Sequence, residues 1–191
     1  AAHNTVVVDN TDQSEMLGLF LWGRRANAVC TEFLPDAPRP RIAAQHDGYM
    51  RLADPVRHQR TLTLDPGLRR IVIEDLLDCV GNHEVALYFH CAESCTVKKI
   101  AERAYRLDAD VVIATFQMDE RLTTSLFHGS ETTKLGWVSR GYHVRSAAST
   151  LVATGTIQGT TLFRTEIVLD ETTDSISLHE RKQTVGTTVA D

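Results

Sequence analysis

The sequence predicts an all-β protein, an antiparallel β-sandwich built from many short strands. Two observations support this prediction. Short segments in which apolar and polar residues alternate recur along the chain, and residues that favour turns separate them. Few segments show the 3.6-residue period of a helix, and short strands at near-regular spacing are typical of sandwiches and barrels.

Turn-forming residues separate the predicted strands along the chain. Segment 162–169 alternates most regularly, and segment 70–74 is a β-branched run. The predicted strands cover residues 5–8, 19–22, 61–64, 70–74, 85–90, 111–116 and 162–169. Turn-forming residues stand at 65–67, 80–82, 108–110, 128–130 and 158–159.

The secondary structure of two further segments is less evident from the pattern. Residues 98–107 carry Ile100, Ala104 and Leu107 at a helical spacing, but we interpret them as strand and turn. Residues 35–40 contain three prolines, which cannot lie in a central strand, so they form a surface loop.

Length and composition indicate one globular domain. The chain has 191 residues, of which 42% are hydrophobic and 24% charged, which excludes a disordered chain. We expect a single domain over 1–178 and a flexible polar tail over 179–191. No apolar run is long enough to span a membrane. The chain begins with Ala and not Met, without a secretory signal, so we expect a processed chain or a piece of a longer protein. Cytoplasm and periplasm both remain open.

Charge is distributed unevenly along the chain. The formal net charge is −5, which makes nucleic acid an improbable partner. The first seventy residues nevertheless hold nine arginines, which would meet an anionic ligand. Solvated surface arginines are the plainer interpretation.

The four cysteines do not indicate a metal site. They form no Cys-x-x-Cys pair, so a zinc site of paired cysteines is not supported. Cys91 and Cys95 would lie about 13 Å apart in one continuous strand, too far for a disulfide unless residues 92–94 turn. We expect free, buried thiols.

No complete catalytic constellation is present, but three clusters carry candidate chemistry. His3, with Asp9 nearby, is a candidate metal ligand, or a histidine in a polar contact at a strand end. His46 and Tyr49 are candidate substrate-binding and proton-transfer groups. In an extended segment they would lie on opposite faces, and a turn with a half-buried tyrosine is at least as plausible.

The third cluster is His58 and Arg60, which share one face of a predicted strand. A sugar-binding sheet often presents such polar side chains, but a solvated strand face gives the same pattern. We take His46, Tyr49, His58 and Arg60 as the candidate substrate-binding residues.

Several strings together resemble a known family. Residues 3–9 (HNTVVVD), 12–15 (DQSE), 46–52 (HDGYMRL) and the His-x-Arg of 58–60 resemble the C-terminal part of heparinase II/III-like polysaccharide lyases. The resemblance is looser through Ile73-x-Asp75 and 87–90, and after about residue 110 only the strand pattern remains.

This resemblance implies a partner and a reaction. Family members join an N-terminal helical toroid to a β-sandwich, bind an acidic polysaccharide between them and cleave it by β-elimination at a uronate. His3 matches a position that ligates a structural zinc in some members, whose other ligands lie upstream. The toroid has no counterpart in this chain, so we expect no turnover by the chain alone and no tightly held metal.

Two functions follow from different classes. One is the C-terminal part of a lyase, and the other is a non-catalytic carbohydrate-binding or scaffolding domain. The absence of a toroid also predicts an exposed apolar face and some homo-oligomerisation through it.

Overall fold

The computed structural model describes residues 2–18, 21–109 and 112–170, and strands dominate it. The strands are β1 (Val6–Val8), β2 (Met16–Gly18), β3 (Leu21–Trp22), β4 (Ala28–Leu34), β5 (Arg41–His46), β6 (Arg57–Asp65), β7 (Arg70–Asp78), β8 (Asn82–His90), β9 (Thr96–Ala101), β10 (Ala104–Ala109), β11 (Val112–Gln117), β12 (Thr123–His128), β13 (Trp137–Gly141), β14 (Val144–Ala147), β15 (Ser149–Gln158) and β16 (Thr161–Leu169). One 3₁₀ helix, η1 (Gly48–Arg51), separates β5 from β6.

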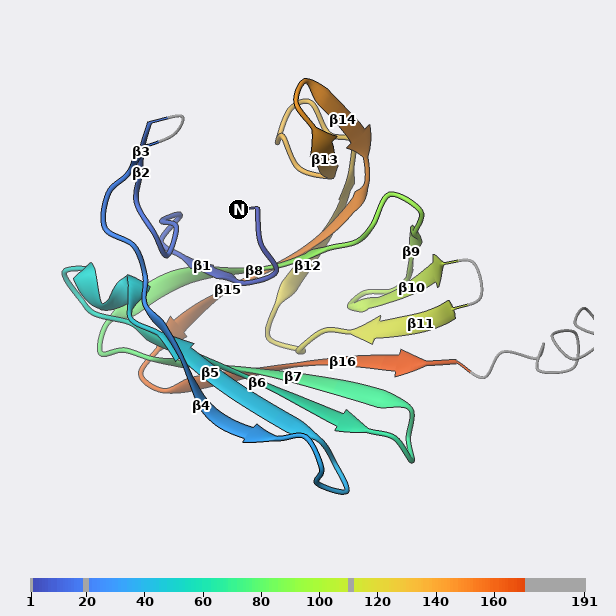
Figure 1. Cartoon of the computed structure of the whole chain (residues 1–191), viewed down its shortest axis with the longest axis horizontal. Helices are drawn as coiled ribbons and strands as arrows, with labels where there is room; N and C mark the ends of the chain where they lie inside the picture. The colour runs from blue at the N-terminus through green and yellow to red at the C-terminus, as the bar shows by residue number, and fades with distance from the viewer. Residues whose placement is uncertain (1, 19–20, 110–111, 171–191) are drawn as a thin grey trace, which may run out of the picture.

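Two antiparallel sheets face each other and form the sandwich (Figure 1). The smaller has the strand order β1-β8-β15-β12, and the larger has the order β4-β5-β6-β7-β16-β11-β10-β9. The hairpins β2–β3 and β13–β14 form separate two-stranded sheets and project on the same side of the molecule. The predicted fold class is therefore confirmed.

The core lies between the two sheets, as the alternation of the strands requires. In β8, Val85, Leu87 and Phe89 point inward, and the residues between them point away. The larger sheet contributes Leu77 and Phe163, both almost fully buried. In β8, alternation in the sequence therefore sets which face of the strand is buried.

Most predicted elements have counterparts. Residues 98–107 form parts of β9 and β10 and the turn between them, and residues 35–40 connect β4 to β5, as predicted. Parts of the predicted strands 19–22 and 111–116 fall outside the described residues, as does the predicted tail over 179–191. Within the described residues, no helix is long and apolar enough to cross a membrane.

The cysteine prediction was half right. None of the four thiols is in a disulfide, but Cys30 is exposed and the other three are only partly buried, so the expectation of burial was wrong. Residues 92–95 do form a turn, closed by the N–H of Cys95 donating to the carbonyl of Ala92 at 3.0 Å.

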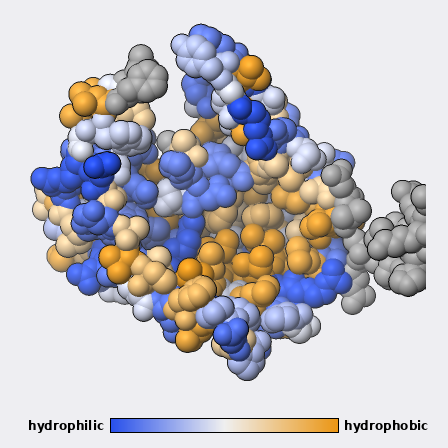
Figure 2. Space-filling model, viewed as in Figure 1, coloured by the Kyte–Doolittle hydropathy of each residue, from blue (hydrophilic) through white to orange (hydrophobic). Residues whose placement is uncertain are grey.

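An apolar strip crosses the uncovered end of the larger sheet. Phe33 in β4 pairs with Ile42 in β5, which pairs with Leu62 in β6, so the three side chains share one face. Phe33 is 64% exposed, and the other two are 38% exposed. Figure 2 shows apolar surface over this sheet on the viewed side. The smaller sheet has only four strands and does not cover the whole of the larger one.

Truncation of a core side chain tests the packing. Leu87 has no exposed surface. We expect Leu87→Ala to lower the free energy of unfolding by about 2–5 kcal/mol, because it removes buried contacts and leaves a cavity. Urea unfolding followed by circular dichroism measures this loss. Val80→Ala, at a position that is 83% exposed, is the control and changes stability little. Equal effects of both substitutions would contradict the described core.

Candidate functional site

A buried hydrogen-bond network joins the first strands of the larger sheet. The backbone N–H of Gly48 donates to Nδ1 of His46 at 3.1 Å, and Nε2 of His46 lies 3.1 Å from Nδ1 of His58. Nε2 of His58 lies 2.7 Å from Oδ1 of Asp75. These residues come from β5, η1, β6 and β7, which the sheet register places side by side.

The contacts determine where each proton sits. A neutral imidazole has one donor nitrogen and one acceptor nitrogen. Because Gly48 donates to Nδ1 of His46, its Nε2 carries the proton and donates to His58, whose Nε2 then donates to Asp75. Burial first, and then the neighbouring His58, lower the pKa of His46 to about 4, so its neutral form is favoured. The chain of donors therefore runs in one direction, toward the carboxylate.

Asp75 is the acceptor at the end of this chain. Its side chain is fully buried and accepts two more hydrogen bonds from Arg60, at 2.7 Å from Nε and 2.9 Å from Nη2. Burial by itself would raise the pKa of Asp75, but the hydrogen bond from His58 and the charge of Arg60 outweigh it and lower this pKa. Asp75 is therefore an anion inside the sandwich.

Arg60 extends the network to the beginning of the chain. Its Nη1 donates to the carbonyl of Asn4 at 2.5 Å, and the amide oxygen of Asn4 accepts from the N–H of His90 at 2.7 Å. The guanidinium also lies 5.8 Å from the ring centre of Phe89. The segment before β1 is therefore hydrogen-bonded to both sheets, to the larger one through Arg60 in β6 and to the smaller one through His90 in β8.

Tyr49 is held in a different way. Its side chain is fully buried in η1, and its hydroxyl donates to the carbonyl of Val6 at 2.7 Å. Burial raises the pKa of Tyr49, which favours the protonated phenol. Of the two conformations that the sequence left open, extended segment or turn, the structure has the turn, as a 3₁₀ helix, and its tyrosine is fully buried and not half-buried. A β-carbon on Gly48 would approach the carbonyl oxygen of Gln13 to 2.5 Å, so only glycine fits there.

A second polar cluster was not found by sequence reasoning. His83 lies almost buried between two carboxylates, with Nδ1 at 2.6 Å from Asp9 and Nε2 at 2.9 Å from Asp54. Burial alone would lower the pKa of His83, but the hydrogen bonds to Asp9 and Asp54 raise it. Asp9 and Asn10 both have positive φ, in a tight turn closed by the bridge between Val8 and Thr11. The Asp-Asn pair after a β-branched run was the available signal.

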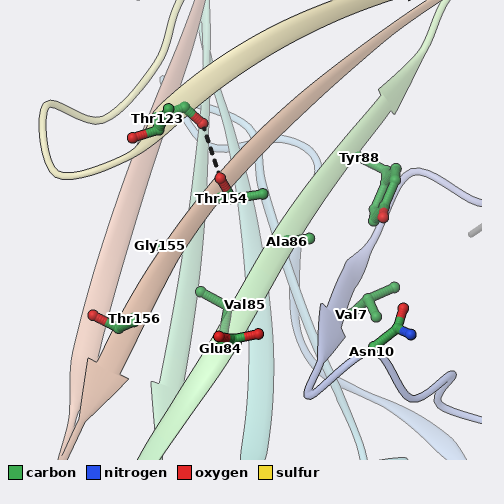
Figure 3. A pocket seen from close by; sticks show the side chains of 10 residues that line it. All are labelled: Val7, Asn10, Glu84, Val85, Ala86, Tyr88, Thr123, Thr154, Gly155 and Thr156. Carbon is green, nitrogen blue, oxygen red and sulfur yellow. Dashed lines mark hydrogen bonds between the residues drawn. The ribbon is translucent and has the colours of Figure 1, made fainter. Parts of the chain in front are cut away.

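The outer face of the smaller sheet carries a shallow groove (Figure 3). Its volume is about 630 Å³. Residues of β1, β8, β12 and β15 and of the turn after β1 line it, namely Val7, Asn10, Glu84, Val85, Ala86, Tyr88, Thr123, Thr154, Gly155 and Thr156.

The groove combines hydroxyl groups with one aromatic ring. Thr154 donates to the carbonyl of Thr123 at 3.4 Å, and Thr156 follows two residues along the same face. The ring of Tyr88 stacks nearly parallel to His90, with 6.2 Å between the ring centres. Figure 2 shows a notch between the two projecting hairpins, above this sheet. Polar hydrogen-bonding groups beside an aromatic ring match the surface of a sugar.

The sequence matches the family described as "Heparinase II/III-like, C-terminal" over residues 1–177. The chain belongs to this family. No curated protein matches it. The recognised resemblance is therefore confirmed.

Solved structures of similar fold include two heparinases. The product of the BT4657 gene, a heparinase III, superposes with a TM-score of 0.65 at 15% identity, over 91% of this chain and 25% of that chain. Heparan sulfate lyase HepC from Pedobacter heparinus gives a TM-score of 0.64 at 13% identity, over 89% of this chain and 24% of that one. At these identities the likeness establishes the fold. The chain spans about a quarter of the length of these proteins.

In this heparinase II/III-like domain, the predicted site residues lie together but do not share one accessible surface. His46, His58 and Arg60 belong to one network, and Tyr49 packs against it with its ring 5.3 Å from that of His46. Tyr49 and His58 are buried, while His46 and Arg60 reach the surface in part. The geometry gives all four a structural role, and direct contact with a substrate stays a prediction for them.

His3 lies apart from that network. It is exposed and lines a hollow of about 180 Å³ with Asp12 and Tyr49. Among the described residues, no group of three or more His, Cys, Asp or Glu side chains could hold a metal ion. The described part of the domain therefore does not form a zinc site by itself.

The neutral state of His46 has a consequence for stability against pH. Its folded pKa of about 4 lies below the ordinary value of 6.5. The unfolded chain therefore binds more protons at this residue between these two values, so the free energy of unfolding falls as the pH decreases through this window. We expect His46→Asn to remove this part of the dependence, which urea unfolding at pH 7 and pH 5 measures.

The exposed turn of the β13–β14 hairpin supplies the control. His143→Asn leaves the network untouched, and His143 has the positive φ that asparagine tolerates. This variant should keep the wild-type pH dependence. A His46→Asn variant with the same slope as the wild type would contradict the described network.

Proposed function

We propose that this domain is the C-terminal part of a polysaccharide lyase that cleaves uronate-containing acidic polysaccharides by β-elimination. The family match over residues 1–177 carries the proposal. The groove on the smaller sheet supports it, since it offers hydroxyls and an aromatic ring for a sugar chain. In our proposal this groove is the domain's share of the substrate cleft, and a helical toroid supplies the other wall.

The reaction constrains which groups are needed. Neutralising the uronate carboxylate makes the C5 proton acidic enough to remove. A base takes that proton, the C4–O bond to the leaving sugar breaks, a C4–C5 double bond forms, and an acid returns a proton to the leaving oxygen. Within the described residues, Tyr49 is an unsuitable base because it is buried and its pKa is raised. We therefore propose that the base lies elsewhere in a longer protein, and that the chain alone is inactive.

Two surfaces support an association with other parts of such a protein. The apolar strip of Phe33, Ile42 and Leu62 is larger than isolated exposed side chains and suits a packing partner, either the toroid or a second copy of the domain. We also propose that His3 contributes one zinc ligand in a longer protein, together with ligands from outside this chain. Its exposed position beside Asp12 is compatible with that role.

A non-catalytic carbohydrate-binding domain is the second candidate. The observation that favours it is the groove itself, whose lining contains one carboxylate, Glu84, and no histidine. Such a groove can hold a sugar, but it lacks the acid and base pair that elimination needs.

A lyase assay separates the two candidates. Heparin-, chondroitin- and alginate-type polysaccharides are incubated with the 191-residue chain and with a longer protein that contains it. We expect the unsaturated product, followed by its ultraviolet absorbance, only with the longer protein. Product formed by the 191-residue chain alone would refute the proposal that the catalytic base lies outside this chain. If the longer protein releases no unsaturated product from any of the three substrates, the non-catalytic domain would be favoured.

The groove makes a separate prediction. Tyr88→Ala should weaken binding of an acidic oligosaccharide to the chain by about fivefold, because a stacked aromatic contact is worth roughly 1 kcal/mol. Titration calorimetry measures the affinity. Tyr88→Phe keeps the ring and should bind nearly as the wild type does. Unchanged affinity of Tyr88→Ala would place the sugar outside this groove.

A further inference from the structure

The nine arginines of the first seventy residues differ in what they contact. Six of them bind protein groups, namely Arg39, Arg41, Arg51, Arg60, Arg69 and Arg70. The side chains of Arg24, Arg25 and Arg57 form no ion pair or hydrogen bond with any residue that the structure describes. All three are exposed. Arginines without a partner are the ones available to an external anion.

These three arginines border two adjoining hollows. The first, of about 380 Å³, is lined by Arg24, Arg25 and Arg51, and the second, of about 230 Å³, by Arg57. Asn27, Asp47 and Met50 line both hollows, so the two are continuous. We call this surface the arginine rim, made of Arg24, Arg25, Asn27, Gln45, Asp47, Met50, Arg51 and Arg57. Figure 2 shows hydrophilic surface on the side of the molecule where η1 lies in Figure 1.

Three carboxylates, those of Asp47, Asp78 and Glu15, lie at or beside the rim. Both oxygens of Asp47 accept hydrogen bonds from Asn27, at 2.7 Å from the backbone N–H and 3.1 Å from the side-chain amide. Asp78, the cross-strand neighbour of Arg57, accepts a hydrogen bond from Thr160 at 2.6 Å. Glu15 lies 3.6 Å from Nε of Arg51 and accepts a hydrogen bond from the backbone N–H of Arg24 at 3.1 Å. Four arginines therefore face three carboxylates, and the guanidinium groups of Arg24, Arg25 and Arg57 are left without a carboxylate partner among the described residues.

The chemistry of the rim fits an anion with repeated charges. Guanidinium groups bind carboxylate and sulfate oxygens in a fork geometry, and several of them along one surface match a polymer with repeated charges. Asn27 and Gln45 add amide groups suited to sugar hydroxyls. The rim lacks tyrosine, phenylalanine and tryptophan, on which single-stranded nucleic acids stack.

We propose that the arginine rim is an accessory subsite for the carboxylate or sulfate groups of an acidic polysaccharide. This inference rests on the proposed function, since it assigns the same class of substrate. The rim shares no residue with the groove on the smaller sheet, so the two sites can be tested independently. Attraction between the arginines and the anionic groups would increase the affinity for a polysaccharide at the rim. This affinity would decrease as the salt concentration rises, because salt screens the charges.

The test compares two variants with the same change in net charge. In the rim variant, Arg24→Gln, Arg25→Gln and Arg57→Gln remove the three unpaired guanidinium groups. In the control, Lys98→Gln, Lys99→Gln and Arg103→Gln remove three positive charges from β9 and the turn that follows it, and β9 is at the opposite edge of the larger sheet from β4. Circular dichroism and the urea midpoint check that both variants fold. Binding of size-defined heparin and alginate oligosaccharides, with neutral dextran and single-stranded DNA alongside, is measured at two salt concentrations.

The proposal expects a selective loss. The rim variant should bind the uronate oligosaccharides about tenfold or more weakly than the wild type, because three charged contacts are lost, and the control should stay within about twofold. Equal losses in both variants, or no uronate binding by the wild type, would overturn the subsite. Single-stranded DNA bound as tightly as the uronate oligosaccharides would overturn its assignment to polysaccharide.

The experiments distinguish a failure of the arginine rim from a failure of the proposed lyase function. If the rim variant binds normally while Tyr88→Ala loses affinity, the arginine subsite fails and the groove stands. If the longer protein releases no unsaturated product, the lyase proposal fails whichever way the rim behaves.

Discussion

The buried carboxylate of Asp75 is the interaction on which the arrangement of this domain depends. An isolated charge inside a β-sandwich would be costly, and here three hydrogen bonds from His58 and Arg60 compensate for it. Each of those donors is engaged further, His58 with His46 and Arg60 with Asn4. A single carboxylate thereby relates the positions of β5, β6 and β7 to the segment before β1.

The same interaction explains why the recognisable strings of the family are spread along the chain and meet in space. The histidine of residues 46–52, the His-x-Arg of residues 58–60 and the aspartate at 75 form one connected network, and Asn4 of the first string closes it. Tyr49 adds a second link, to Val6 in β1. In this chain the strings hold β1, the edge strand of the smaller sheet, against the larger sheet, and the surfaces that we propose for a polysaccharide lie around them.

Those surfaces differ in character. The groove on the smaller sheet offers hydroxyls and one aromatic ring, whereas the arginine rim offers charge. The apolar strip at the open end of the larger sheet suits a protein partner. The two surfaces that we propose for a sugar polymer and the one that we propose for a partner are consistent with a domain that spans about a quarter of the length of the solved heparinases.

The sequence by itself determined the fold class, the loops and the family. Period-two alternation decides which side chains can be buried in a sheet, and turn residues mark where strands end, so both are local properties that a sequence displays. The strand and turn over residues 98–107 and the loop over residues 35–40 were predicted on that basis. The neighbourhood of His46, Tyr49, His58 and Arg60 was also indicated, through the resemblance.

Only the tertiary structure decided what those residues do. Whether a histidine reaches a ligand or donates to a buried carboxylate depends on residues far away in the chain, as Asp75 is from His58, and no local pattern encodes that contact. The pairing of His83 with Asp9 and Asp54 was missed for the same reason. The sequence also presented nine similar arginines, and only the packing of the strands separated six with protein partners from three that face solvent.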